Sequence, residues 1–380
     1  MKRFLCVLFA AVFAVTLGFA QELKLDGYIN SGLGLIIDND SGNEVKLVVM
    51  GVDSEQFAGR FRLNGAYTNA DKNIGANFRL QYQGNNPSSG FAPSFVYGWV
   101  KFFDMLQFKA GLVDDAVWET GGAILKDDQG EGAGVLARLT PVAGLDIGLG
   151  AFAWSPSGGS GNNSYATPGK LQNWNDVKYT AMVSYTLPDV FKINLSGRTF
   201  NASGNNSARV LAEFRLLAVK GLTAIVELEM DNLYNRADHF NYFTTDGKVN
   251  IFETFAYKID SLNFGLNAAQ YISNAAAADM VGIRFNPWIS YALLDGKLVP
   301  RLDGVFFLAG EWKSAQNYDR RADLAATNKK GTYVFNVRPS LKINVDSRNS
   351  FEIGDVMYYE KATGGKTFSN VFYLDYVFRF

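Results

Sequence analysis

The sequence predicts an all-β fold, a transmembrane antiparallel β-barrel of about 18 strands, with about 16 as the near alternative. Segments of roughly ten residues alternate apolar and polar side chains along residues 21–380. Short turns alternate with mostly longer polar connections, as in outer-membrane barrels. After residue 20, no apolar run approaches the ~18 to 20 residues that a membrane helix needs. A chain of this kind enters lipid only as a closed sheet, because an open edge leaves backbone groups unsatisfied.

The first 20 residues have the layout of a secretory signal peptide. Lys2 and Arg3 form a basic start, an apolar core follows, and the small residue Ala20 ends the segment. We expect cleavage after Ala20, so that residues 1–20 are the signal peptide and residues 21–380 the barrel. An uncleaved anchor is the alternative, but the apolar core is short for a membrane span.

Charge and cysteine content exclude several classes of protein. Lys and Arg total 36 and Asp and Glu total 37, for a formal net charge of -1, so no global field attracts nucleic acid. The only cysteine, Cys6, lies inside the predicted signal peptide. The exported chain is therefore expected to have no disulfide, thiolate metal site or cysteine nucleophile, and no cofactor is expected.

The alternation continues from one segment to the next. Its apolar members include Phe61, Leu63, Tyr67, Ile74, Phe78, Leu80, Tyr82, Val177, Tyr179, Val183, Tyr185, Phe191, Ile193, Leu195, Tyr333, Phe335, Val337, Leu341 and Ile343. Their polar neighbours include Arg60, Arg62, Asn64, Asn77, Arg79, Gln81, Lys178, Thr180, Ser184, Lys192, Asn194, Arg198, Asn336, Arg338 and Lys342. This period of two predicts strands with one apolar and one polar face.

The strand boundaries follow from the turn residues. Short turns are expected near residues 70–72, 104, 141–144, 188–189, 219–221, 260, 294–296 and 346–349. Residues 44–52 either extend the second strand or form a separate one. A secreted sandwich or propeller is the alternative fold, but soluble sandwiches seldom repeat Arg and Lys in the middle of so many strands.

The last residues, FYLDYVFRF (372–380), again alternate and end on an aromatic side chain. Together with the signal peptide and the paired strands, this ending resembles that of a Gram-negative-type outer-membrane porin. The resemblance implies an outer-membrane location among lipids, and it allows a homotrimer. It also implies that the barrel-assembly machinery recognises the last strand through Phe372, Leu374, Tyr376, Phe378 and Phe380.

General porins fold their third outer loop inward, and the third loop here is residues 113–132, with a loose motif match at WETGG (118–122). The resemblance implies a constriction loop that carries the acids Asp114, Asp115, Glu119, Asp127, Asp128 and Glu131. Strand parity predicts the facing pore-lining cations Arg60, Arg62, Arg79, Lys109 and Arg138. Opposed charges would set up a transverse field that selects solutes by charge and dipole. The alternative is a loop whose acids form a solvated tip.

Elsewhere on the polar face, basic residues outnumber acidic ones. The basic residues are Lys178, Lys192, Arg198, Arg209, Arg215, Lys258, Arg284, Arg301, Arg338 and Lys342, and the acidic ones are Glu213, Glu227, Glu229, Asp303 and Glu352. A basic lumen and a weak anion preference follow, unless the acidic third loop dominates at the narrowest point.

The function expected is a water-filled porin for passive diffusion of small hydrophilic solutes or ions. Catalysis is not expected, because the single histidine, His239, lies in a predicted loop and its neighbour Asp238 would point to the opposite side of a strand. Two alternatives stay open: an adhesin or structural barrel whose loops at 155–175, 231–247 and 311–330 bind partner molecules, and a substrate-specific channel.

Overall fold

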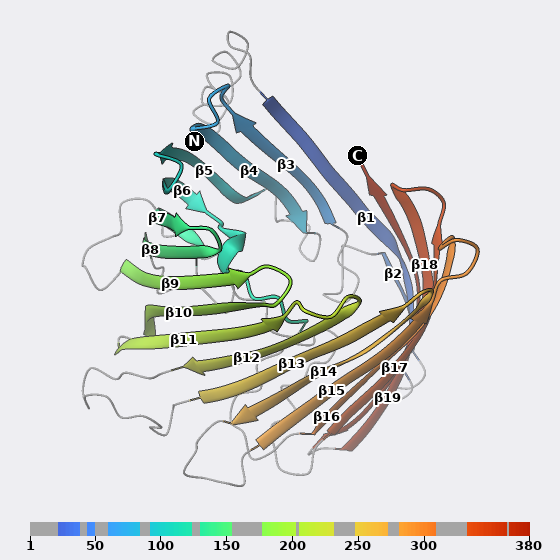
Figure 1. Cartoon of the computed structure of the whole chain (residues 1–380). Coiled ribbons are helices and arrows are strands. Elements are labelled where there is room, and N and C mark those ends of the chain that lie inside the picture. The colour runs from blue at the N-terminus through green and yellow to red at the C-terminus, as the bar shows by residue number, and fades with distance from the viewer. Residues whose placement is uncertain are drawn as a thin grey trace.

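The structure is a computed structural model, and it describes residues 22–38, 44–49, 60–83, 92–123, 130–153, 177–202, 205–231, 248–272, 281–308, 333–362 and 365–380. Nearly all of these residues belong to one antiparallel sheet that curves into a barrel (Figure 1). Within the described part of the chain, no helix has the length and hydrophobicity needed to cross a membrane.

The strands follow one another around the barrel in chain order. The first ones are β1 (Glu22–Asp38), β2 (Glu44–Val49), β3 (Arg60–Thr68), β4 (Ile74–Gln83), β5 (Ala92–Phe102), β6 (Leu106–Val113), β7 (Gly132–Val142), β8 (Leu145–Ala153) and β9 (Val177–Leu187). The remainder are β10 (Phe191–Ala202), β11 (Asn205–Leu216), β12 (Leu222–Asp231), β13 (Lys248–Ile259), β14 (Leu262–Ile272), β15 (Val281–Tyr291), β16 (Leu298–Leu308), β17 (Tyr333–Asn344), β18 (Asn349–Ala362) and β19 (Gly365–Arg379). A short 3-10 helix, η2 (Ala116–Trp118), lies between β6 and β7.

The barrel has 18 strand positions, which confirms the larger of the two predicted numbers. Strands β2 and β3 share one position, because both pair with the same edge of β1. Residues 22–30 of β1 pair with β3, and residues 33–38 pair with β2. Residues 44–49, whose role the sequence left open, therefore prolong the second strand position.

The first and last strands close the ring. Strand β1 pairs antiparallel with β19 from Tyr28 opposite Arg379 to Asp38 opposite Ser369. Beyond these pairs, the Gly27 amide donates to the Phe380 carbonyl at 3.0 Å, and the Phe380 amide donates to the Gly27 carbonyl at 3.1 Å. Closure removes the free edge that an open sheet would present to lipid.

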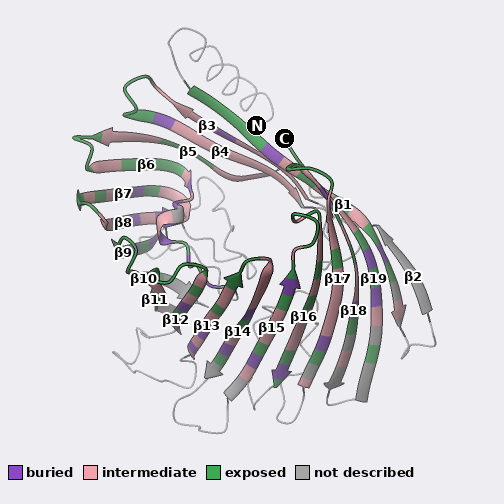
Figure 2. Ribbon diagram, turned by 45° about the vertical axis from the view of Figure 1, so that its right-hand side comes forward, coloured by how far each residue is buried: buried purple, intermediate pink, exposed green. Residues whose placement is uncertain are grey.

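The outer face of the sheet is apolar and the inner face is mostly polar, the reverse of a soluble protein. On β19, the side chain of Leu374 is 41% exposed on the outer face, whereas that of its neighbour Tyr373 is 5% exposed on the inner face. The same alternation of exposed and buried positions is clear along β9, and exposed and buried residues share other strands (Figure 2). Large exposed side chains on the outer face include Leu25, Leu33, Leu149, Val183, Leu195, Val226, Ile289, Leu302 and Ile353. The predicted apolar outer face is therefore present in the structure.

The eight predicted short turns all join neighbouring strands at one rim of the barrel. In the turn after β17, the Asp346 carboxylate accepts hydrogen bonds from the amides of Arg348 and Asn349, both at 2.7 Å. These donors stabilise the charged carboxylate and lower the pKa of Asp346, with the Arg348 amide as the largest cause. Several turns contain a residue with positive φ, among them Lys72, Asp189 and Gly221.

A chain that ends at Arg379 is expected to unfold at a lower temperature than the full chain. The deletion removes the two closing hydrogen bonds between Gly27 and Phe380, and the ring that lies 6.2 Å from Phe61. The unfolding temperature is read from the shift between the compact folded band and the unfolded band in electrophoresis after stepwise heating. A Phe306→Ala chain, altered on the outer face of β16 and away from the closure, serves as the control. Equal unfolding temperatures for the full and shortened chains would contradict the role assigned to Phe380.

Candidate functional site

The described start of the third loop, residues 114–123, leaves β6 and follows the inner wall of the barrel as far as β13. Three consecutive backbone amides of the loop donate to the wall: Gly121 to Glu213 Oε2 at 2.5 Å, Gly122 to Glu227 Oε1 at 2.9 Å, and Ala123 to Thr254 Oγ1 at 2.9 Å. These acceptors lie on β11, β12 and β13. The described first half of the loop is therefore attached to a part of the wall far along the ring from its own strand.

Small residues make this attachment geometrically feasible. A Cβ atom on Gly121 would overlap the guanidinium group of Arg215, and a Cβ atom on Gly122 would overlap the carboxylate of Glu227. The absence of side chains lets the loop backbone approach the wall closely enough for its amides to donate. The segment WETGG, which resembles a porin loop motif, thus contains the two glycines of the contact.

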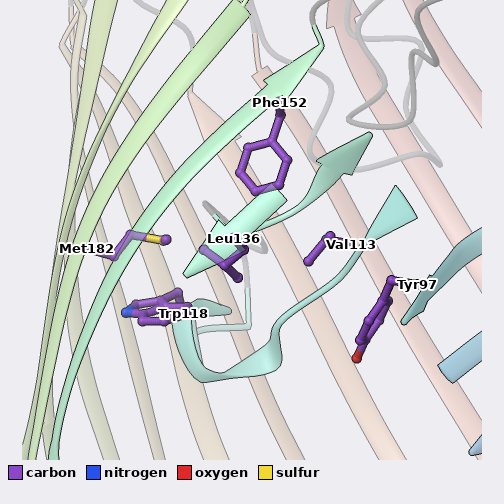
Figure 3. Packing of buried hydrophobic residues seen from close by; sticks show 6 residues of the cluster. All are labelled: Tyr97, Val113, Trp118, Leu136, Phe152 and Met182. Atoms are coloured by element: carbon purple, nitrogen blue, oxygen red, sulfur yellow. The ribbon is translucent and has the colours of Figure 1, made fainter. Parts of the chain in front are cut away.

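An apolar cluster holds the start of the loop. Trp118, at the end of η2, is 2% exposed and packs with the inward-facing side chains shown in Figure 3. The other members of the cluster are Tyr97, Val113, Leu136, Phe152 and Met182. Gly148 of β8 provides the space, because a Cβ atom there would lie 2.7 Å from the Trp118 ring. The barrel wall therefore has a local hydrophobic core beneath the loop, although most of its inner face is polar.

Charged residues also hold the loop. The Asp115 carboxylate lies 2.8 Å from Lys109 Nζ and 3.9 Å from Arg138 Nη1, while Asp114 lies 3.7 Å from Arg79 Nη1. Lys192 Nζ of β10 donates to the Val117 carbonyl at 3.1 Å. The described half of the loop is thus held on both of its sides. Ionic contacts join it to β4, β6 and β7, and hydrogen bonds join it to β10 through β13.

One pair departs from the sequence-based expectation of opposed charges across an opening. Lys109 and Asp115 are in direct contact, and their side chains are 8% and 4% exposed. A cation and an anion removed from water are stable only when they neutralise each other, so they pair within the wall. Lys109 therefore contacts the loop directly, and its role in lining the pore stays a prediction.

The other predicted loop acids differ in placement. Glu119 is exposed, and Glu131 is half-buried with its backbone carbonyl accepting from Lys178 Nζ at 3.1 Å. Asp127 and Asp128 lie outside the described residues. Of the predicted wall cations, Arg138 donates through Nε to Asp146 Oδ1 at 2.8 Å and lies 5.9 Å from the centre of the Trp118 ring.

The remaining predicted cations form an arginine sector on β3 and β4, made of Arg60, Arg62 and Arg79. Arg62 donates through Nε and Nη2 to Gln81 Oε1 at 3.0 and 2.7 Å. Arg79 donates to Asn64 Oδ1 at 2.9 Å, and its guanidinium lies 4.6 Å from the centre of the Phe95 ring. Neutral amides and rings position Arg62 and Arg79, and Asp114 at 3.7 Å offsets part of the charge of Arg79.

Other wall arginines are paired with acids on the same or a neighbouring strand. The pairs are Arg209 with Glu229 at 3.4 Å, Arg215 with Glu213 at 2.9 Å, Arg301 with Asp303 at 2.5 Å and Arg338 with Glu352 at 2.5 Å. These pairs lower the contribution of the basic majority to the potential of the lumen. Parity placed these residues on the inner face, and the pairs within one strand, Arg215 with Glu213 and Arg301 with Asp303, follow from that parity. The other two pairs join neighbouring strands and depend on strand register, which the alternation along one strand does not specify.

The residues of the predicted assembly signal follow the expected alternation. Phe372, Leu374 and Phe380 are exposed on the outer face. Tyr376 lies 4.8 Å from Phe351 between ring centres, and Phe378 lies 6.0 Å from Phe380. Among the residues that the structure describes, no group of three or more His, Cys, Asp or Glu side chains could hold a metal ion.

The barrel is similar to solved outer-membrane structures at low sequence identity. The outer-membrane protein OprD of Pseudomonas aeruginosa matches with a TM-score of 0.56 and 11% identity over 94% of this chain and 95% of that one. OccK1 (OpdK) of the same bacterium matches with a TM-score of 0.58 and 12% identity over 94% and 98%. A structure of OpdK with vanillate matches with a TM-score of 0.57 and 12% identity over 94% and 98%.

These structural matches establish a shared fold, the closed 18-stranded antiparallel barrel of outer-membrane porins. No protein-family model matches the sequence, and no curated protein matches it either.

Replacing Trp118 with Ala is expected to loosen the third loop. Burial of a Trp side chain in a packed cluster contributes about 3 to 5 kcal/mol, and the Gly121, Gly122 and Ala123 amides depend on the loop staying in place. Hydrogen exchange of these amides should become at least about tenfold faster, since each 1.4 kcal/mol is a factor of ten. Trp288→Ala, on β15 at a distance from the loop, is the matched control and should leave the same amides protected. Unchanged protection in the Trp118 variant would contradict the anchoring role of the cluster.

Proposed function

We propose that this protein is an outer-membrane porin through which small hydrophilic solutes and ions diffuse passively. The observation that carries the proposal is the inverted polarity of a closed 18-stranded barrel: apolar side chains outside, charged and amide side chains inside. Barrels of 16 to 18 strands are too wide for their inner side chains to fill, so they enclose an aqueous channel. The outer face matches lipid, and the inner face matches water.

The remaining parts of the proposal concern export and assembly. Residues 1–20 act as a signal peptide cleaved after Ala20, which sends the chain to the periplasm. The barrel-assembly machinery then recognises the alternating last strand that ends at Phe380, and a homotrimer is an allowed assembly. Outer-membrane lipid surrounds the barrel. The protein is not an enzyme and needs no cofactor, and its solved structural neighbours include the outer-membrane proteins OprD and OpdK.

The third loop supplies the selectivity of the channel in this proposal. Acidic residues at the loop pair with wall cations, so Asp114 and Asp115 are largely neutralised where they stand. Asp114 offsets only one member of the arginine sector of β3 and β4, Arg79, and the positive charge of Arg62 in the sector favours a weak preference for anions. A substrate-specific channel for small carboxylates is the second candidate. The same sector favours it, and the structural neighbour OpdK was solved with vanillate, an aromatic carboxylate.

Refolded protein is expected to conduct when it is added to a planar lipid bilayer. An aqueous lumen of an 18-stranded barrel should produce discrete current steps that scale with salt concentration and are ohmic at low voltage. Protein unfolded by heating before addition is the control and should produce no steps. A folded barrel without conductance would contradict the porin proposal and would favour the adhesin alternative.

Substituting Arg62 with Gln is expected to weaken the anion preference. The change removes one positive charge from the arginine sector and should lower the anion-to-cation permeability ratio about twofold. The ratio is measured from the reversal potential in a salt gradient. Lys220→Gln, in the short turn between β11 and β12, removes the same charge outside the lumen and should leave the ratio unchanged. Clear cation selectivity of the unmodified channel would contradict the basic-wall part of the proposal.

A further inference from the structure

The outer face carries two pairs of polar side chains in the middle of its apolar surface. The first pair is Glu253 of β13 and Gln270 of β14. Glu253 alternates with Phe255, which is 45% exposed on the outer face, while its neighbour Phe252 is 1% exposed on the inner face. The carboxyl group of Glu253 therefore projects toward the surroundings of the barrel.

The second pair is Asp355 of β18 and Asn370 of β19. Asp355 lies between two exposed outer-face residues, Ile353 and Met357, and its neighbour Val356 is buried on the inner face. Asn370 lies two residues before the exposed Phe372, also on the outer face. Both pairs thus consist of a carboxyl residue on one strand and an amide residue on the next strand along the ring.

The polar atoms of these pairs are incompletely satisfied. Gln270 Nε2 donates to Glu253 Oε1 at 3.3 Å. Glu253 Oε2, Asp355 Oδ1 and Asn370 Oδ1 are buried oxygen atoms that accept no hydrogen bond. Carboxyl and amide groups facing hydrocarbon are costly, and ionisable residues at such positions generally have a protein partner or a functional role. The position of these two polar pairs on the lipid-facing side therefore indicates a polar partner on another polypeptide.

The two pairs lie the same number of residues from the short turns of their strands. Glu253 lies six residues along its strand from Ile259, at the short-turn end of β13, and Asp355 lies six residues from Asn349, at the short-turn end of β18. Gln270 is opposite Ile251 in register, and Asn370 is opposite Met357, so each amide lies the same two residues further from the short turns. Copies of one membrane protein share orientation and depth, so these groups can meet between copies.

The arrangement around the ring is also complementary. In both pairs the carboxyl residue comes first and the amide residue follows on the next strand, in the same direction around the barrel. When two upright barrels face each other, the left side of one faces the right side of the other. The first pair of one copy therefore places its carboxyl opposite the amide of the second pair on its neighbour, and its amide opposite the carboxyl.

We propose that β13–β14 of one copy docks against β18–β19 of the next, with Glu253 beside the neighbour's Asn370 and Gln270 beside the neighbour's Asp355. Strands β15 to β17 separate the two surfaces on each barrel (Figure 1). A head-to-tail contact of this kind closes into a ring of copies and removes both pairs from lipid. A two-fold dimer through one surface would leave the other pair in lipid. The inference rests on the membrane placement in the proposed function.

Crosslinking between introduced cysteines tests the contact directly. The only native cysteine is Cys6, so Cys6→Ser provides a cysteine-free background. In that background, the Glu253→Cys, Asn370→Cys double variant, treated with a short bismaleimide in outer-membrane vesicles, should form covalent dimers and higher multiples. Glu253→Cys alone and Asn370→Cys alone should stay monomeric. The matched control combines Asn370→Cys with Val183→Cys on the outer face of β9 and should also stay monomeric.

A second measurement keeps the proposal testable if cysteine disturbs the surface. Glu253→Leu and Asp355→Leu should each reduce the oligomer fraction in mild detergent at least about fivefold. The isolated variant barrel should resist heat unfolding as well as the unmodified protein, because the substitution removes a carboxyl group from the lipid face. Val183→Leu should leave the oligomer unchanged.

Three outcomes would overturn the ring proposal. They are oligomers that neither leucine substitution reduces, crosslinks in a single-cysteine variant, and monomers alone in every sample. Bilayer conductance of the same samples separates this outcome from failure of the porin proposal: a conducting monomer overturns only the contact between copies. A folded oligomer that does not conduct overturns only the porin.

Discussion

Closure of the backbone hydrogen-bond network is the constraint on which this structure depends. In hydrocarbon no water is available for an unpaired amide or carbonyl, so every strand in the membrane needs a partner on both edges. Strand β1 meets this requirement by pairing with β19 along one edge and with β3 and β2 in succession along the other. In the described part of the chain the ring is thereby closed between β1 and β19, and its width follows from the 18 strand positions.

A ring of this size leaves a wide interior. Its inner face has two kinds of surface, one apolar and one polar. Beneath the third loop, Trp118 and its apolar neighbours form a compact core, with Gly148 leaving room for the indole. Elsewhere the wall is polar, and most charges lie within reach of a partner, as Arg338 does with Glu352. The loop backbone connects these regions through Gly121 and Gly122, and the selectivity of the proposed channel depends on where it is held.

The outer face shows where the inverted pattern has exceptions. Apolar side chains face lipid without a free-energy cost, whereas the carboxyl groups of Glu253 and Asp355 are costly there. Their placement at equal distances along the strands from the short turns, each beside an amide, is best explained by contact between copies. In this view the inner charges act on solutes, while the outer polar pairs act on assembly, and the two roles are separated by the thickness of a single sheet.

The sequence by itself determined the class of fold, the inner and outer faces, the short turns and the preferred strand number, because a period of two and turn-forming residues are local properties of the chain. Parity also placed Arg62 and Arg338 on the inner face. Only the tertiary structure decided that Lys109 and Asp115 neutralise each other, and that Gly121 and Gly122 reach β11 and β12. The contacts of Gly121 and Gly122 join residues far apart in sequence and depend on strand register and barrel curvature, and Lys109 meets Asp115 only because the loop folds back against the wall. No local pattern encodes either arrangement.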